Sequence, residues 1–289
     1  EDPEWLRLAR NHGFSVNTWT VDAANDMRRV LALHIDQLTT DEPDLARRVL
    51  AEEGIRELVR NGEMKPAKTK KAKKLKKQLT AGDYVLCYAG GEQAKYYDKK
   101  WVKDFVTYTD RNGREHWLFD GFLFLQIKDF GAGVAFDPGH KDHDGNVLQA
   151  ATQSDWMKLI DYYFEPGQCL DAIEQAVGEA AERIGAPGYK RQIIISIPNP
   201  IPFKNPAAKT GGSTYWGLLD GRVADMTKAE DRFGACKWYI DEVLKRYRKQ
   251  KYKYVDLVGF YYVTEETSGS GTLMPDLSAY LHAKGYPFT

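Results

Sequence analysis

The stretch Val-Asp-Leu-Val-Gly-Phe-Tyr-Tyr-Val-Thr-Glu-Glu, residues 255–266, decides the class of fold. Its apolar run has the length and the β-branched and aromatic composition of a buried strand, and it ends on two carboxylates. In an α/β barrel, side chains at the carboxyl ends of the strands face the reaction site. Glu265 and Glu266 are therefore the candidate catalytic residues, placed for acid/base or nucleophilic work.

Only one of these two acids can face a barrel axis, because neighbouring side chains of a strand point to opposite faces. We expect Glu265 to be the inward one, with Tyr261 and Gly259 on its side, since a glycine suits a crowded interior layer. The alternative is an exposed pair of acids that opens a loop, which the Thr-Ser-Gly-Ser-Gly segment at 267–271 would favour.

Apolar runs of the same character occur earlier in the chain, at 84–89, 121–127 and 192–197. Helical periodicity falls between and after the runs, at 154–164, 170–184, 229–248 and 277–284. Continuous apolar strands that alternate with helices predict a parallel sheet covered on both faces, and hence an α/β fold. We interpret residues 83–289 as the first four βα units of a (β/α)8 TIM-like barrel, with a new apolar run beginning at Tyr286 and Phe288.

The first 54 residues also alternate between strand and helix. The pattern predicts helices at 4–12, 23–33 and 42–53 and strands at 15–21 and 35–40, which is a βαβα portion of another partial barrel. Lysine then dominates, with eight lysines and no acid in residues 65–78. A basic arm that binds nucleic acid interleaves aromatic residues or arginines. Because none occurs here, we interpret 55–82 as a solvated linker.

The overall composition excludes several classes of protein. Lys+Arg and Asp+Glu are both 41, so no net charge attracts nucleic acid or an anionic membrane. No apolar stretch reaches the length of about 18 residues that suggests a membrane span. Cys87, Cys169 and Cys236 lie too far apart for a zinc motif or a disulfide framework, and we expect buried thiols.

Aromatic residues gather at the predicted strand ends and in the loops beside them, namely Tyr88, Tyr96, Tyr97, Trp101, Trp117, Trp216, Tyr261 and Tyr262. A sugar ring binds with its apolar face on an aromatic plane, so this set favours a carbohydrate cleft. We take Tyr88, Trp117, Trp216 and Tyr261 as candidate substrate-binding residues. For each of them singly, the alternative is packing at the edge of the core.

The loop at 140–146 places Asp142, Asp144 and Asn146 at alternate positions, as at the start of a calcium loop. However, Gly145 falls one place early, and Gln153 stands where the bidentate Glu is needed. We therefore expect a polar turn and no cofactor in this part of the chain.

Two stretches near the N-terminus resemble the C-terminal end of glycerophosphodiester phosphodiesterases, Gly-Phe-Ser-Val-Asn-Thr-Trp-Thr-Val-Asp at 13–22 and Ile-Asp-Gln-Leu-Thr-Thr-Asp-Glu-Pro-Asp at 35–44. The resemblance implies the last two βα units of a TIM barrel, with Trp19 lining the site and a divalent cation as cofactor. Asp22 stands where that family has Asn. The family's catalytic histidines and metal-binding acids belong to its front half, so the resemblance implies that residues 1–54 are inactive alone.

Residues 83–289 resemble a bacterial family of unknown function with a glycosidase-like barrel. The matching pieces are Phe-Asp-Gly-Phe-Leu-Phe-Leu at 119–125, Ile-Ser-Ile-Pro-Asn-Pro at 195–200, Phe-Gly-Ala-Cys-Lys-Trp-Tyr-Ile-Asp at 233–241 and the end of the opening stretch, 259–266. The resemblance implies that Glu265 sits after the fourth strand, where glycosidase barrels carry an acid/base residue. Thr264 replaces the Asn that is usual before it. The partner carboxylate would come from a later strand.

The expected function is that of a carbohydrate-active hydrolase with Glu265 as general acid/base. One alternative is metal-dependent hydrolysis of glycerophosphodiesters, judged from residues 1–54. The other is a glycan-binding module without catalysis, in which Glu265 accepts hydrogen bonds from sugar hydroxyls. The expected partner is a carbohydrate rather than a nucleic acid. A secreted or cell-envelope location would fit the bacterial resemblance, and the sequence shows no leader that would assign it.

Overall fold

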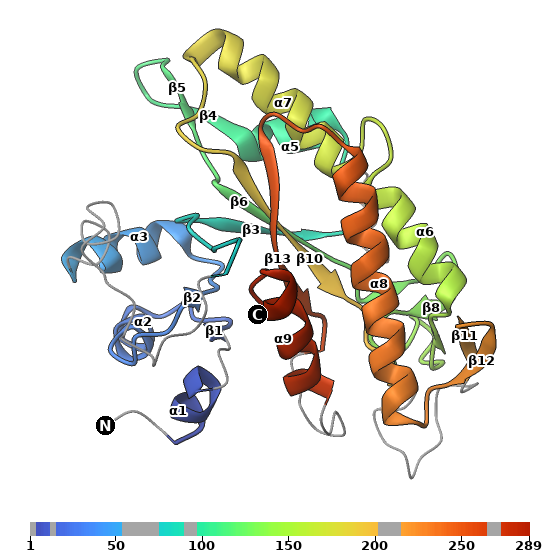
Figure 1. Ribbon diagram of the computed structural model, residues 1–289. Helices are drawn as coiled ribbons and strands as arrows, with labels where there is room; N and C mark the ends of the chain where they lie inside the picture. Colours follow the sequence, from blue (N-terminus) through green and yellow to red (C-terminus); the bar gives the residue numbers. More distant parts are fainter. Residues whose placement is uncertain (1–3, 12–15, 54–74, 90–96, 202–214, 265–272) are drawn as a thin grey trace.

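Four parallel strands form the central sheet and follow one another in chain order (Figure 1). They are β3 (Tyr84–Tyr88), β6 (Gly121–Leu125), β10 (Arg191–Ile197) and β13 (Val255–Tyr262). Each of them matches, to within one residue at its start, an apolar run that was interpreted as a strand from the sequence. The computed structural model describes residues 4–11, 16–53, 75–89, 97–201, 215–264 and 273–289.

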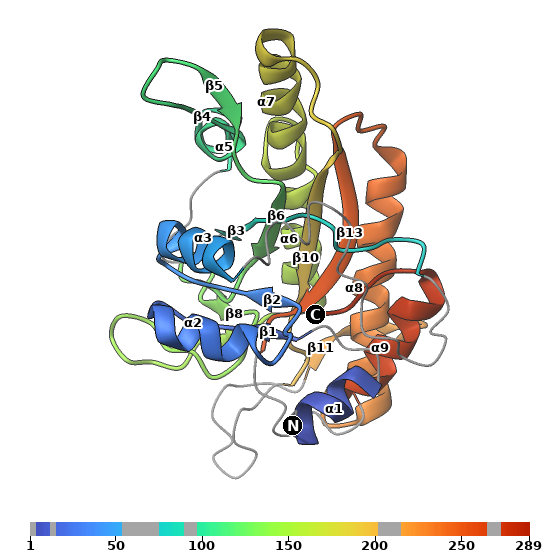
Figure 2. The ribbon, with the colours of Figure 1, turned by 90° about the vertical axis from the view of Figure 1, so that its left-hand side faces the viewer.

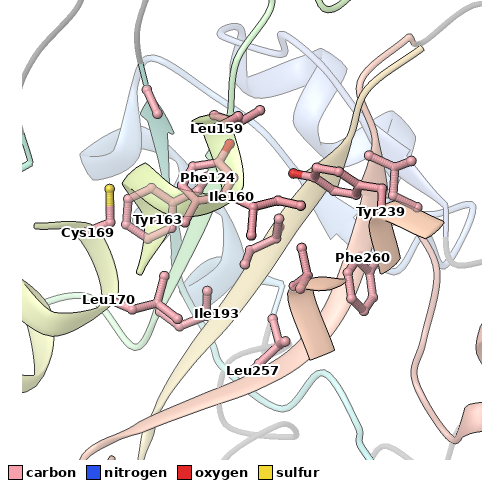
Figure 3. Packing of buried hydrophobic residues seen from close by; sticks show 14 of the residues in the cluster. Phe124, Leu159, Ile160, Tyr163, Cys169, Leu170, Ile193, Tyr239, Leu257 and Phe260 are labelled. Carbon is pink, nitrogen blue, oxygen red and sulfur yellow. The ribbon is translucent and has the colours of Figure 1, made fainter. Parts of the chain in front are cut away.

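Helices cover one face of this sheet. They are α5 (Lys99–Val106), α6 (Gln153–Tyr163), α7 (Cys169–Ile184), α8 (Ala229–Lys249) and α9 (Leu273–Lys284). Alternate strand residues, such as Phe124, Ile193 and Phe260, pack beneath the helices in one apolar core with Tyr163 and Tyr239 (Figure 3). The predicted helices are present, whereas α5 was not predicted.

A further parallel pairing begins at the other side of β13. Phe288 bridges Phe260 in parallel, and the amide of Thr289 donates a hydrogen bond to the carbonyl of Phe260 at 3.0 Å. Residues 286–289 thus extend the sheet in chain order. The described residues form an open sheet and contain no closed barrel, so the structure supports the α/β class and its parallel sheet.

The second face of the sheet is also largely buried. Leu123, Leu125, Ile194 and Val258 are buried on this face, and Leu79 packs against them. Burial on both faces was expected from the apolar strands, and helices α5 to α9 supply the layer over the first face. Residues 75–82, which we call the crossing segment, contribute to the other (Figure 2).

Polar contacts hold the crossing segment over the amino-terminal ends of the strands. Lys77 Nζ forms an ion pair with Asp256 of β13 at 2.5 Å. The amides of Thr80 and Ala81 donate to Gln192 Oε1 of β10 at 3.0 and 3.1 Å. These residues belong to the stretch interpreted as a solvated linker, and they are packed on the sheet. Residues 54–74 of that stretch lie outside the described residues.

The short strands of the connections form three smaller sheets. They are the hairpin of β4 (Thr107–Thr109) and β5 (Glu115–Trp117), the sheet of β7 (Lys128–Asp129), β8 (Val134–Ala135) and β9 (Gln149–Ala150), and the hairpin of β11 (Tyr215–Leu219) and β12 (Arg222–Asp225). None of these strands was predicted from the sequence.

The N-terminal part has the predicted βαβα order. It contains α1 (Glu4–Asn11), β1 (Asn17–Thr18), α2 (Ala24–Leu31), β2 (Gln37–Leu38) and α3 (Pro43–Glu52), with β1 and β2 paired in parallel. Met27, Ala46 and Val49 form its small core. Both strands are shorter than predicted.

All three cysteines are buried free thiols, as predicted, and burial raises the pKa of each above the ordinary thiol value. Of the helices that the structure describes, none is both long and apolar enough to span a bilayer.

The start of β6 requires a glycine because of Tyr84. A Cβ added at Gly121 would lie 2.3 Å from the Tyr84 ring, and the ring cannot swing away without breaking the 2.5 Å hydrogen bond from its hydroxyl to Gln192. We expect Gly121→Ala to lower the free energy of unfolding by about 2 kcal/mol through overpacking. Urea unfolding followed by tryptophan fluorescence measures the change.

Gly188→Ala is the matched control, because nothing lies within 4 Å of a Cβ at Gly188. This variant should unfold at the urea midpoint of the parent or slightly above it. Equal midpoints for the Gly121 and Gly188 variants would show that the Tyr84 ring is not fixed above β6.

Candidate functional site

A buried polar cluster lies at the carboxyl ends of the central strands. It consists of Asp137, His140, Asn199, Tyr262 and Thr264, and we call it the Asp137 network. Tyr262 is the last residue of β13, and the other members come from the connections after β6, after β10 and after β13. Carboxyl ends of parallel strands lie at one edge of a sheet, which is where α/β proteins place their ligands.

Asp137 joins these connections through both of its carboxylate oxygens. Its Oδ1 accepts hydrogen bonds from Asn199 Nδ2 at 3.0 Å and from Thr264 Oγ1 at 2.6 Å. Its Oδ2 lies 3.2 Å from His140 Nε2. The carboxylate therefore connects the segments that follow β13 and β10 with each other and with its own loop.

Asn199 extends the network to the end of β13. Its Oδ1 accepts from the Tyr262 hydroxyl at 2.8 Å and from the amide of Ile201 at 2.9 Å. Burial, followed by the effects of nearby Cys236 and Asp137, raises the pKa of Tyr262 well above the ordinary phenol value. The phenol thus stays protonated and donates, which fixes the orientation of the Asn199 amide.

Three members of the Asp137 network, Asp137, Asn199 and Tyr262, are buried, whereas His140 and Thr264 are partly exposed. Asp137 and Asn199 are 5% and 6% exposed, whereas 32% of the His140 side chain is exposed. A buried carboxylate requires hydrogen-bond donors around it, and the side chains of Asn199 and Thr264 supply them.

Local sequence brings His140 back onto Asp137. The residues between them are Pro138 and Gly139, and Gly139 has a φ of +100°. Proline followed by a glycine with positive φ is the pattern of a type II turn. A side chain other than hydrogen would be strained at this φ, so the glycine allows the reversal that places the imidazole beside the carboxylate.

The predicted catalytic pair, Glu265 and Glu266, lies outside the described residues. The strand before them has the predicted alternation. Tyr261 packs with the apolar residues of the second face, and a Cβ at Gly259 would approach Leu79 on that face. Phe260 and Tyr262 belong to the core under the helices.

Two of the predicted substrate-binding residues share the second face at its carboxyl end. Tyr88 is the last residue of β3 and is 40% exposed, opposite Leu125. Tyr261 lies opposite Ser196 on β10. The two tyrosines therefore lie on one face, with β6 and β10 between their strands.

The three tryptophans among the predicted binding residues lie elsewhere. Trp117 is at the amino-terminal end of the sheet, where its ring stacks 4.8 Å from the guanidinium of Arg191. Trp216 is 2% exposed and packs edge-on against Trp156 in the core. Trp19, in the N-terminal part, is 58% exposed. None of them belongs to the Asp137 network.

The loop at 140–146 is a polar turn, as expected. Asp142 accepts hydrogen bonds from the amides of Asp144 and Asn146 and from the Asn146 side chain. These bonds lower the pKa of Asp142. In the part of the chain that the structure describes, no group of three or more His, Cys, Asp or Glu side chains could hold a metal ion.

Asp137, His140 and Asn199 were not predicted as site residues. Two signals in the sequence point to them: Asp-Pro-Gly-His at 137–140 predicts a turn that folds the fourth residue onto the first, and Pro-Asn-Pro at 198–200 follows a buried strand directly. Neither signal says that the two segments meet, because the distance between them is 62 residues in sequence.

Fold and site together define an α/β protein with an in-order parallel sheet and a buried carboxylate at the carboxyl ends of its strands. Residues 83–289 match a family described as a domain of unknown function, DUF4855, and the chain belongs to that family. The match begins at the residue before β3 and does not include residues 1–54. Comparisons with curated proteins and with solved structures give no match.

Proposed function

We propose that the sheet of residues 83–289 is the first part of a (β/α)8 barrel. Its strands are parallel and in chain order, and residues 286–289 continue that order. The helices lie on one face, as on the outside of a barrel, while apolar side chains fill the other. The crossing segment then closes the amino-terminal end, which leaves the carboxyl end for ligands.

We further propose that this part is a carbohydrate-active hydrolase with Glu265 as its general acid/base. One observation carries the proposal: the buried carboxylate of Asp137 holds Thr264, the residue before Glu265, at the carboxyl end of β13. A catalytic side chain must be held in a fixed geometry to be effective. A surface acid in a loop does not need a buried anchor on the preceding residue.

The tyrosines of the second face are the proposed sugar contacts. Tyr88 offers an exposed ring at the end of β3, and Tyr261 lies on the same face at the end of β13. Trp117 and Trp216 take no part in this proposal, because the first lies at the opposite end of the strands and the second is buried in the core.

Glu265→Gln tests the proposal, with Glu266→Gln as the matched control. In the full-length protein we expect the first change to lower kcat on glycosides by ~10²- to 10⁴-fold, the usual contribution of a positioned acid/base. The affinity for the glycan should change little, because glutamine has nearly the same shape as glutamate and can still form hydrogen bonds. The control should keep most of the activity. Chromogenic glycosides and polysaccharides provide the assay, and a glycan array measures binding.

The outcomes separate the candidate functions. Equal rates in the parent and the Glu265 variant would refute Glu265 as the acid. Retention of glycans on the array without cleavage by the parent would favour the glycan-binding module. Release of glycerol 3-phosphate that needs a divalent cation, and that is lost when residues 1–54 are deleted, would favour the phosphodiesterase instead.

A further inference from the structure

His140 and Asp137 have the arrangement of a proton-transfer pair. The imidazole Nε2 faces Asp137 Oδ2 at 3.2 Å, and the other ring nitrogen, Nδ1, has no hydrogen-bond partner among the described residues. The carboxylate is buried, while about a third of the imidazole side chain is exposed. A histidine whose inner nitrogen is held by a carboxylate presents its outer nitrogen to solvent or substrate.

The alternative is that this contact only closes the turn at 137–140. A turn of this kind needs no help from the side chain of its fourth residue, because Pro138 and Gly139 already specify it. Asp137 is also fixed from outside the turn, by Asn199 and Thr264. These two donors come from different connections, and they set the orientation of the carboxyl group that His140 meets.

The hydrogen bonds also specify the tautomer of His140. Asp137 Oδ1 accepts from two donors, as a carboxylate does, and its Oδ2 is then an acceptor as well. Nε2 of His140 must therefore carry the proton in this contact. Nδ1 is consequently the basic nitrogen, with a lone pair available to take a proton.

We propose that Asp137 orients His140 as the proton-accepting residue of this site. This inference rests on the proposed glycoside hydrolysis. Nδ1 takes a proton from a water molecule while the water oxygen bonds to the anomeric carbon. The bond from that carbon to the leaving oxygen breaks, and this oxygen receives a proton from the separate acid of the proposed function. The imidazolium then returns its proton to bulk water, and the acid regains one from it.

With His140 as the base, the proposed function no longer needs a second catalytic carboxylate. A two-carboxylate mechanism needs a second acid from a later strand, whereas an oriented imidazole can activate the water instead. The displacement is then a single step, in which water attacks the face opposite to the leaving group. The released sugar must have the inverted anomeric configuration.

The first test measures the tautomer and does not depend on activity. In the full chain with ¹⁵N-labelled histidine, long-range ¹H–¹⁵N spectra should show His140 with its proton on Nε2. Asp137→Asn should change this signal, because the carboxamide can offer an N–H in place of an acceptor. A proton on Nδ1, or the same His140 spectrum in both proteins, would overturn the orientation by Asp137.

The second test measures catalysis in the same chain. His140→Ala should lower kcat by ~10²-fold or more with KM nearly unchanged, and added imidazole should restore part of the rate. His143→Ala is the matched control, because His143 stacks on Phe130 at 4.7 Å in the same loop, and it should keep the parent's rate. Proton NMR of the first product should show inversion.

Failure of the proposed hydrolase function and failure of the role of His140 give different results. If the parent cleaves no glycoside, the proposed function fails together with this step, while the tautomer still decides whether Asp137 orients His140. If the parent cleaves glycosides but the His140 variant matches it, or the product retains its anomeric configuration, the role of His140 is overturned and the hydrolase stands.

Discussion

Gln192→Leu is expected to lower the free energy of unfolding by about 3 kcal/mol, because the buried Gln192 amide forms several of the hydrogen bonds that hold the crossing segment. Gln192 Oε1 accepts from the amides of Thr80 and Ala81 and from the hydroxyl of Tyr84 at 2.5 Å. Its Nε2 donates to the carbonyl of Gln78 and to Thr80 Oγ1. Each such bond contributes about 1 kcal/mol net, and the apolar leucine offsets part of the loss. Urea unfolding measures the change.

Gln175→Leu provides the control for this measurement. Gln175 lies on the exposed side of α7, and among the described residues its side chain donates only to Asp171, so its loss should change the stability by less than about 0.5 kcal/mol. Hydrogen exchange gives a second readout, since the amides of Thr80 and Ala81 should exchange faster in the Gln192 variant alone. Unchanged exchange there would show that Gln192 does not fix the crossing segment.

The central strands could be predicted because each is a continuous apolar run of strand length. Such a run is buried on both sides, and burial on both sides is typical of a parallel sheet with crossover connections. The predicted alternation at Gly259 and Tyr261 also holds, because a strand leaves only two choices of face. These features depend on short-range periodicity, which the sequence displays directly.

The connections were harder to predict, although some carried local signals. Helix α5 is short and rich in lysine, yet Asp98 caps it by accepting from the amide of Trp101 at 2.9 Å. The β4–β5 hairpin turns at Asn112-Gly113, with a φ of +76° at the glycine, and Asn-Gly is a known hairpin signal. Both elements are too short for a hydrophobic period to reveal them.

The crossing segment shows how a lysine-rich composition can mislead. Lys77 is one of the eight lysines that indicated a solvated linker, yet its amine pairs with Asp256 and its backbone amide donates to the carbonyl of Gly285. A lysine can pack its stem on a protein surface while its charge meets a partner. That partner is 179 residues away in sequence, so no local pattern could reveal the contact.

Asp137→Ala is expected to lower the free energy of unfolding by about 4 kcal/mol, more than any other change considered. It leaves the buried amide of Asn199 and the hydroxyl of Thr264 without their acceptor, and bonds to a charged group contribute about 1.5–3 kcal/mol each. Asp137→Asn should cost less, because the carboxamide oxygen can still accept from both. Thermal and urea unfolding measure these differences.

The exposed turn of the same loop supplies the control for Asp137. Asp142 also accepts three hydrogen bonds, but it is only partly buried and lies among exposed residues. Water can replace an acceptor there, so Asp142→Ala should cost much less than Asp137→Ala. If the two alanine variants lose equal stability, burial of the Asp137 network does not matter. Asp137 would then not fix the position of the residues that follow β13. The observation that supports a catalytic acid at position 265 would no longer hold.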